Sequence, residues 1–123
     1  MKIIVADDEF ANRLLISEIV KGLGHELVQV ENGEQVIHAL AMYEDIDLVL
    51  MDIEMPVMNG VEAVKRIREE FPFPKNKLPV IAITGHQQHI FLGDHEESDF
   101  DNFLTKPYSI EKFTEILDCY RKS

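Results

Sequence analysis

DLVLMDIEMPVMNG, residues 47–60, places four apolar residues directly before an aspartate. The run Leu48–Met51 is typical of a strand buried on both faces, because neither set of alternate positions is polar. Asp52 follows at the carboxyl end of that strand, and a second carboxylate, Glu54, comes two residues later. Asn59-Gly60 then indicates a helix cap. A buried strand that presents carboxylates at its end indicates a functional site at that end.

Short apolar runs and stretches of helical periodicity alternate along the whole chain. Such an alternation predicts an α/β domain, in which a doubly wound parallel sheet carries helices on both faces through right-handed crossovers. In such sheets, ligands bind outside the carboxyl ends of the strands. The pattern predicts strands at 2–6, 27–30, 47–51, 79–84 and 103–105, and helices at 10–21, 34–43, 61–71, 87–97 and 109–121.

The helical periodicity also predicts which residues share a face. We expect Asn59 and Ser109 to cap their helices, and Cys119 to pack rather than react. The predicted apolar positions are Phe10, Leu14, Ile16, Ile19 and Val20 in the first helix, and Val36, Ile37, Leu40 and Ala41 in the second.

Length and composition narrow the class of protein. The 123 residues suit one compact domain, and 46% hydrophobic residues suffice for a core. One cysteine excludes an internal disulfide framework and fits a reducing compartment, so we expect a cytoplasmic protein. The formal charge of −11 argues against binding to nucleic acid or to an anionic membrane surface. We find no run of apolar residues long enough for membrane insertion.

Polar residues collect where the predicted strands end. Asp7-Asp8 follows the first strand, Asp52 ends the third, Thr84 the fourth and Lys106 the fifth. Clustered carboxylates repel one another unless a cation joins them, and Mg²⁺ suits one or two carboxylates with several waters. Mn²⁺ is a second candidate ion for the same carboxylates. Asp52 is then a candidate nucleophile toward phosphorus, with Lys106 and Thr84 as partners for phosphoryl oxygens.

These motifs together resemble the receiver domain of the two-component response-regulator family. The resemblance runs along the whole chain, so residues 1–123 are expected to form one receiver domain. It implies a single (βα)5 flavodoxin-like fold, the family of CheY, with sheet order 2-1-3-4-5. The segments that carry it are KIIVADDE (2–9), MDIEMPVMNG (51–60), ITG (83–85) and FLTKP (103–107).

The resemblance assigns roles residue by residue. It makes Asp52 the phosphoacceptor and Lys106 the lysine that pairs with the phosphoryl group. It makes Thr84 and Phe103 the switch pair, and Glu54 and His86 modulators of the aspartyl-phosphate lifetime. The implied Mg²⁺ ligands are the carboxylates of Asp7, Asp8 and Asp52 and the backbone carbonyl of Glu54.

The resemblance also implies a function. The chain would take a phosphoryl group from a histidine kinase or a histidine phosphotransfer protein, and would catalyse only its own phosphorylation and slow dephosphorylation. Phosphorylation would repack the surface of the fourth helix, fifth strand and fifth helix, through which a homodimer is expected. Asn12-Arg13 and the loop FPFPKNK (71–77) resemble receivers of hybrid kinases. The sequence leaves open whether the receiver acts alone or belongs to a longer regulator.

Two other functions remain as alternatives. A phosphorylation-independent interaction module would keep the fold, but the complete set of strand-end residues argues against it. A haloacid-dehalogenase-like phosphohydrolase also uses a strand-end aspartate with Mg²⁺, and Glu54 sits two residues after Asp52, where that family has its general acid. That family carries its nucleophile on the first strand, however, so we rank this alternative lower.

Overall fold

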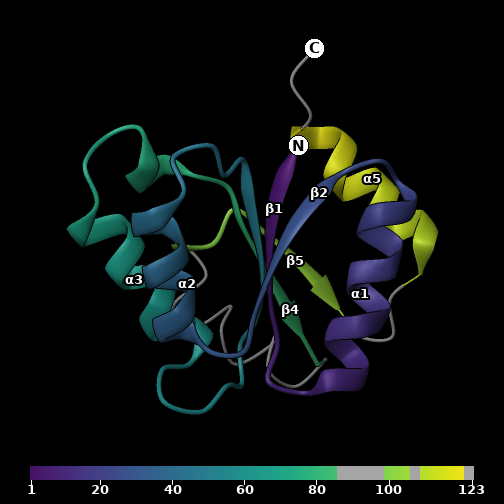
Figure 1. The fold of residues 1–123 in the computed structure, drawn as a ribbon, viewed down its shortest axis with the longest axis horizontal. Coiled ribbons are helices and arrows are strands. Elements are labelled where there is room, and N and C mark those ends of the chain that lie inside the picture. Colours follow the sequence, from purple (N-terminus) through teal and green to yellow (C-terminus); the bar gives the residue numbers. More distant parts are fainter. Residues whose placement is uncertain (86–98, 106–108, 121–123) are drawn as a thin grey trace.

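The computed structural model describes residues 1–85, 99–105 and 109–120. Its centre is a five-stranded parallel sheet in the order β2-β1-β3-β4-β5, as predicted (Figure 1). Each of the three central strands contains four consecutive apolar residues, which suits a strand covered on both faces. The strands are β1 (Lys2–Ala6), β2 (Glu26–Val30), β3 (Leu48–Asp52), β4 (Val80–Thr84) and β5 (Asn102–Thr105).

Helices cover both faces of this sheet. In Figure 1, α1 and α5 lie on one face, and α2 and α3 lie on the other. The predicted fourth helix, residues 87–97, lies outside the described residues. The helices are α1 (Phe10–Gly22), α2 (Gly33–Met42), α3 (Gly60–Glu70) and α5 (Ile110–Tyr120), with a short 3₁₀ helix, η1 (Lys75–Lys77), before β4.

The core forms two layers because successive side chains of a strand point to opposite faces. In β3, Leu48 and Leu50 pack toward α1 and α5, whereas Val49 and Met51 pack toward α2 and α3. All five residues of β3 are buried. Asp52 therefore ends a strand that is held firmly from both sides.

The strand register brings the carboxyl ends to one edge of the sheet. Ala6, the last residue of β1, pairs with Met51 of β3. Asp52 pairs with Ile83, and Thr84 pairs with Thr105. Each predicted strand-end residue in the described part of the chain therefore lies at the same edge.

The predicted helix caps are confirmed. The Asn59 side chain accepts a hydrogen bond from Glu62 N at 2.9 Å, and Glu62 Oε1 accepts one from Asn59 N at 3.3 Å, which completes a capping box. Ser109 Oγ accepts a bond from Lys112 N at 3.2 Å. The capping box fixes the start of α3 directly after the loop that follows Asp52.

Three predictions about packing are wrong. Phe10 and Leu14 are 66% and 46% exposed, because α1 buries the face of Ile16, Ser17 and Val20, which excludes Leu14, and Phe10 is the first residue of the helix. Ala41 is exposed, and Ala39 is buried in its place. Cys119 is exposed too, because α5 buries the face of Phe113 and Leu117.

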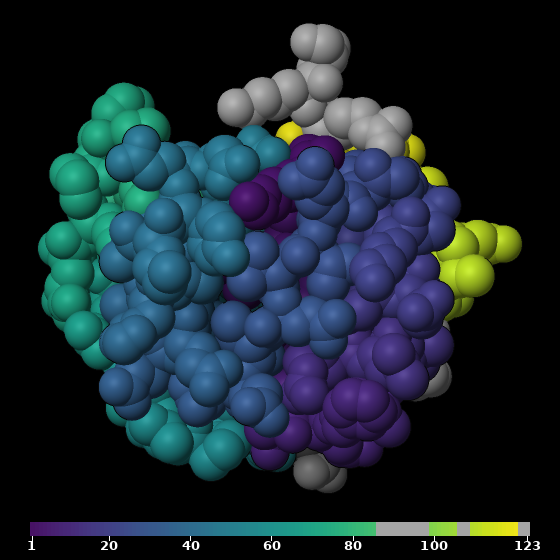
Figure 2. Space-filling view, in the orientation of Figure 1, coloured from purple at the N-terminus to yellow at the C-terminus, as the bar shows by residue number. Residues whose placement is uncertain are grey.

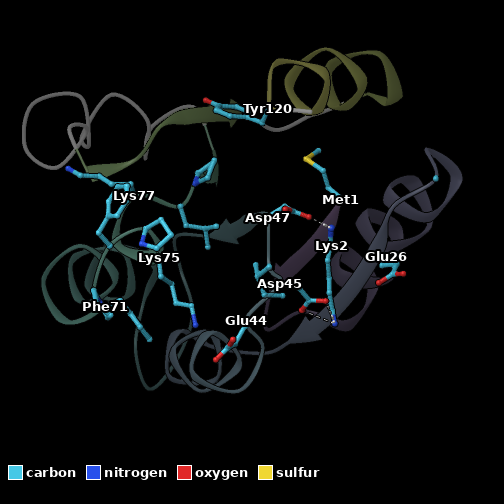
Figure 3. A pocket seen from close by; sticks show the side chains of 17 residues that line it. Met1, Lys2, Glu26, Glu44, Asp45, Asp47, Phe71, Lys75, Lys77 and Tyr120 are labelled. Atoms are coloured by element: carbon cyan, nitrogen blue, oxygen red, sulfur yellow. Dashed lines mark hydrogen bonds and ion pairs between the residues drawn. The ribbon is translucent and has the colours of Figure 1, made fainter. Parts of the chain in front are cut away.

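The amino ends of the strands border a separate hollow of about 1110 Å³ (Figure 3). Lys75 closes one side, because its ammonium donates to the carbonyls of Leu40 and Tyr43 at the end of α2. Lys2 closes another side through an ion pair with Asp45 at 3.3 Å. In Figure 2 the amino-terminal residues, in purple, are recessed between α2 and β2. This hollow lies at the opposite end of the sheet from the strand-end carboxylates.

Candidate functional site

The strand-end carboxylates form a tight cluster. One carboxylate oxygen from each of Asp7, Asp8 and Asp52 lies within 4.8 Å of the other two. Asp7 is fully buried and Asp52 is 5% exposed, whereas Asp8 is open to solvent. Asp8 and Asp52 also line a shallow hollow of about 650 Å³, together with Glu54. The cluster is therefore rigid on its inner side and accessible on its outer side.

Asp7 is held through three of its polar atoms. Its backbone N–H donates to Val30 O of β2 at 3.2 Å. Its carboxylate Oδ1 accepts from Glu9 N at 2.9 Å, and its backbone carbonyl accepts from Arg13 Nη1 at 2.8 Å. Because main chain and side chain are both restrained, the Asp7 carboxylate has little freedom to turn away from the cluster.

Asp52 is held by the loop that follows it. Glu54 N donates to Asp52 Oδ1 at 3.2 Å, and Gly60 N donates to Ile53 O at 2.8 Å. The start of α3 packs so closely on the end of β3 that a Cβ on Gly60 would lie 2.7 Å from the carbonyl oxygen of Asp52. Glycine is therefore required at this position for the close approach.

A second glycine braces the same loop from α2. Gly33 N donates to Met58 O at 2.8 Å, and a Cβ on Gly33 would lie 2.5 Å from that oxygen. Val57, in the middle of the loop, has φ 69°, a left-handed conformation that is costly for a β-branched residue. The sequence signals Gly33 only as a turn residue beside Asn32, and it carries no signal for this contact with a residue 25 positions away.

Thr84 and Phe103, the predicted switch pair, lie on neighbouring strands and face the same side of the sheet. Ala82 pairs with Phe103 and both belong to the α2–α3 side of the core, and Thr84 follows two residues after Ala82. Thr84 is fully buried, and its Oγ1 has no hydrogen-bond partner among the described residues. The Phe103 ring is half-buried and lies 5.6 Å from the ring of Phe100.

Two predicted site residues are not placed. Lys106 and His86 lie outside the described residues. The structure therefore brings together Asp7, Asp8, Asp52 and the loop carrying Glu54, and it sets Thr84 at the adjacent strand end.

The donor set fits a hard divalent cation. Three carboxylates this close repel one another, and oxygen ligands of this kind suit Mg²⁺. The half-open cluster leaves room for water and for an incoming oxyanion on the side of Asp8 and Glu54. Among the described residues, no helix is long and apolar enough to cross a membrane.

Comparison with known proteins agrees with this geometry. A family model described as the response regulator receiver domain matches residues 3–118. Sensor protein GacS of Pseudomonas syringae is 34% identical over 94% of the chain, but the chain spans only 13% of the length of GacS. Two-component response regulator 24 of Arabidopsis thaliana is 31% identical, and the match covers 93% of this chain and 79% of that protein.

A solved structure shares the fold. The receiver domain of sensor histidine kinase PA1611 from Pseudomonas aeruginosa superposes with a TM-score of 0.85, at 24% identity, over 97% of this chain and 95% of that one. That crystal structure contains a magnesium ion coordinated in its active site cleft.

Proposed function

The chain belongs to the response regulator receiver family of two-component signalling, and we propose on that premise that Asp52 accepts a phosphoryl group. The convergence of Asp7, Asp8 and Asp52 within 4.8 Å carries this proposal. A phosphoacceptor has to be held in place and reachable from solvent. Asp52 ends a fully buried strand and also lines an open hollow, which supports both requirements.

The proposed reaction is a transfer from nitrogen to oxygen. A carboxylate oxygen of Asp52 attacks the phosphorus of a phosphohistidine, the phosphorus–nitrogen bond breaks, and the imidazole keeps the bonding electron pair. The product is an aspartyl phosphate, which water hydrolyses later to restore the carboxylate and release inorganic phosphate. The chain turns over no other substrate in this proposal, so it is not an enzyme in the ordinary sense.

A magnesium site would be built from this chain's own oxygens. The ligands would be the carboxylates of Asp7, Asp8 and Asp52 with the Glu54 carbonyl, and the related PA1611 receiver, which holds Mg²⁺, supports this choice of ion. When bound, Mg²⁺ neutralises charge on the phosphoryl oxygens during transfer. Mn²⁺ has similar oxygen preferences and is proposed only as a substitute.

The remaining predicted residues take supporting roles. Lys106 pairs with a phosphoryl oxygen as a point charge. Thr84, whose buried hydroxyl has no partner among the described residues, donates to another phosphoryl oxygen, and Phe103 on the next strand repacks in response. Glu54 comes two residues after Asp52 in the sequence and His86 comes two residues after Thr84, and both tune the lifetime of the aspartyl phosphate.

Membership of the receiver family suggests the partners of this chain. In this proposal a histidine kinase or a histidine phosphotransfer protein supplies the phosphoryl group. The chain spans 13% of GacS and 16% of RpfC from Xanthomonas campestris, both sensor or regulatory proteins, so a place within a hybrid kinase is one proposed context. The proposed output surface is formed by the predicted fourth helix (87–97), β5 and α5, and it includes the proposed dimer contact.

Intact-mass spectrometry after incubation with acetyl phosphate tests the function. Wild type is expected to gain one phosphoryl group in the presence of Mg²⁺ and little in its absence. Asp52→Asn is expected to gain none, whereas Asp118→Asn, the same change at an exposed residue of α5, should behave as wild type. No gain in wild type from acetyl phosphate or from a phosphorylated histidine kinase would contradict the proposal and favour a phosphorylation-independent module.

A further inference from the structure

Arg13 connects α1 to the end of β1 beneath the carboxylate cluster. Its side chain is only 12% exposed, which is unusual for a guanidinium on the outer layer of a domain. Nη1 donates to the Asp7 carbonyl at 2.8 Å, and Nη2 lies 4.0 Å from Glu31 Oε1 on the turn before α2. The guanidinium also lies over the ring of Phe10, 5.5 Å from its centre. Arg13 thus ties together three segments that meet at the site.

The contact with Asp7 restrains a main-chain atom and leaves the carboxylate available. The Asp7 carboxylate is already oriented by Glu9 N, and the backbone N–H by Val30 O. The bond from Arg13 is the third restraint, and it is charge-assisted and largely shielded from water, which makes such bonds strong. Without it, the peptide after Asp7 would lose one restraint, and the carboxylates of Asp7 and Asp8 on either side of that peptide would be held less firmly.

Arg13 also carries a positive charge near the cluster, and this charge acts in the opposite direction. A cation beside the carboxylates weakens the binding of a second cation, so its removal would tighten metal binding. The geometric effect of Arg13 strengthens metal binding and its charge weakens it, and the two effects depend differently on salt. Salt at 1 M has a screening length of about 3 Å, but it screens the charge effect of Arg13 only in part, because Arg13 and Asp7 are largely buried. The part that remains would lower the dissociation constant when Arg13 is replaced, so a raised constant still reports the geometric effect.

We propose that Arg13 is a positioning residue that raises the affinity of the carboxylate cluster for Mg²⁺ by holding the main chain of Asp7. This inference rests on the magnesium site of the proposed function. Contacts behind metal ligands are typically worth about 10–100-fold in metal affinity. Because Arg13 holds the ligand's backbone instead of its carboxylate, we expect a smaller effect of roughly three- to tenfold.

The test is a titration of ¹⁵N-labelled protein with MgCl₂, followed by amide chemical shifts at about 1 M KCl. Amide spectra report the fold and the Mg²⁺ dissociation constant together, without any phosphorylation. Arg13→Met removes the donor and the charge at similar length, and Arg13→Lys keeps a cationic donor. Arg66→Met removes the same charge from an exposed pair on α3, distant in sequence from the cluster, and serves as the control.

The expected result is a dissociation constant raised about three- to tenfold in Arg13→Met, partly restored in Arg13→Lys and unchanged in Arg66→Met. An unchanged or lowered constant in a folded Arg13→Met would overturn the inference while leaving the proposed function intact. If Arg13→Met does not fold, Arg13→Gln, which is too short to reach the Asp7 carbonyl, gives the same comparison. An absence of Mg²⁺-dependent shifts in wild type would remove the metal site itself and this inference with it.

Discussion

Gly60→Ala adds one methyl group where α3 begins against the end of β3. The new Cβ would lie 2.7 Å from the Asp52 carbonyl oxygen and 2.9 Å from Ile53 Cα. Ordinary contacts begin near 3.4 Å, so α3 and the end of β3 have to separate by about 0.7 Å. Both neighbours are backbone atoms, and neither can rotate away as a side chain would.

The cost follows from that separation. Overpacking in a well-packed region costs about 1–3 kcal/mol, and the better helix propensity of alanine returns at most about 1 kcal/mol. We therefore expect a net loss of about 1–2 kcal/mol in the free energy of unfolding. At roughly 3–6 °C per kcal/mol for a domain of this size, the melting temperature should fall by about 3–12 °C. Displacement of Asp52 by several tenths of an ångström should slow its phosphorylation roughly tenfold.

Gly22→Ala is the matched control. A Cβ on Gly22, the last residue of α1, would meet nothing within 4 Å. This variant should be as stable as wild type or more stable by up to about 1 kcal/mol, with an unchanged phosphorylation rate. Urea unfolding measures the stability, and time courses of intact mass with acetyl phosphate measure the rate.

Two results would refute the reasoning. If Gly60→Ala matches Gly22→Ala in stability, the close approach of α3 to β3 is not required. If Gly60→Ala loses stability but phosphorylates at the wild-type rate, the contact supports the fold without positioning Asp52.

Three further changes test other parts of the account. Thr84→Val removes a buried hydroxyl that has no partner among the described residues, so the free energy of unfolding should stay the same or rise by about 1 kcal/mol. The amide chemical shifts that phosphorylation causes on β5 should become smaller in this variant, and shifts of wild-type size would exclude Thr84 from the switch. Asn59→Ala removes the α3 capping box and should cost about 1 kcal/mol in urea unfolding, and a loss of zero would show that the cap is dispensable. The hydrogen bond from Arg66 lowers the pKa of Glu70 in the folded protein. Any stabilisation from this pair is therefore complete at a pH above the pKa of Glu70 in the unfolded chain, and it is lost as the pH falls through the lower pKa of Glu70 in the folded protein. In Arg66→Gln, NMR should find Glu70 titrating at higher pH than in wild type, and an equal midpoint would contradict the ion pair.

Most of the fold was predictable because it follows from local patterns. The short apolar runs of β3 and β4 indicate strands covered on both faces, and the helical stretches between them indicate parallel crossovers. In the described part of the chain the element boundaries agree to within one residue, as the shift of the third strand from 47–51 to Leu48–Asp52 illustrates. Asp7, Asp8 and Asp52 were found by the same logic, since parallel strands end at a common edge.

The parts that could not be predicted depend on how one element packs against another. Apolar spacing predicts that a helix has a buried face, but not where that face is centred, and Leu14 falls outside the face that α1 buries through Ile16, Ser17 and Val20. The bond from Arg13 to the Asp7 carbonyl joins α1 to β1, and the bond from Gly33 to Met58 joins α2 to the loop after β3. Neither contact leaves a local pattern, because only the packed fold brings the partners together.

The most direct test of the central claim is to locate the phosphoryl group on the chain. Borohydride reduces an aspartyl phosphate to homoserine, which peptide mass spectrometry then places at one position. The account predicts homoserine at position 52, dependent on Mg²⁺ and on a phosphodonor, and none at Asp7 or Asp8. Homoserine at another aspartate, or none in a chain that has gained a phosphoryl group, would contradict the assignment of Asp52 as the acceptor.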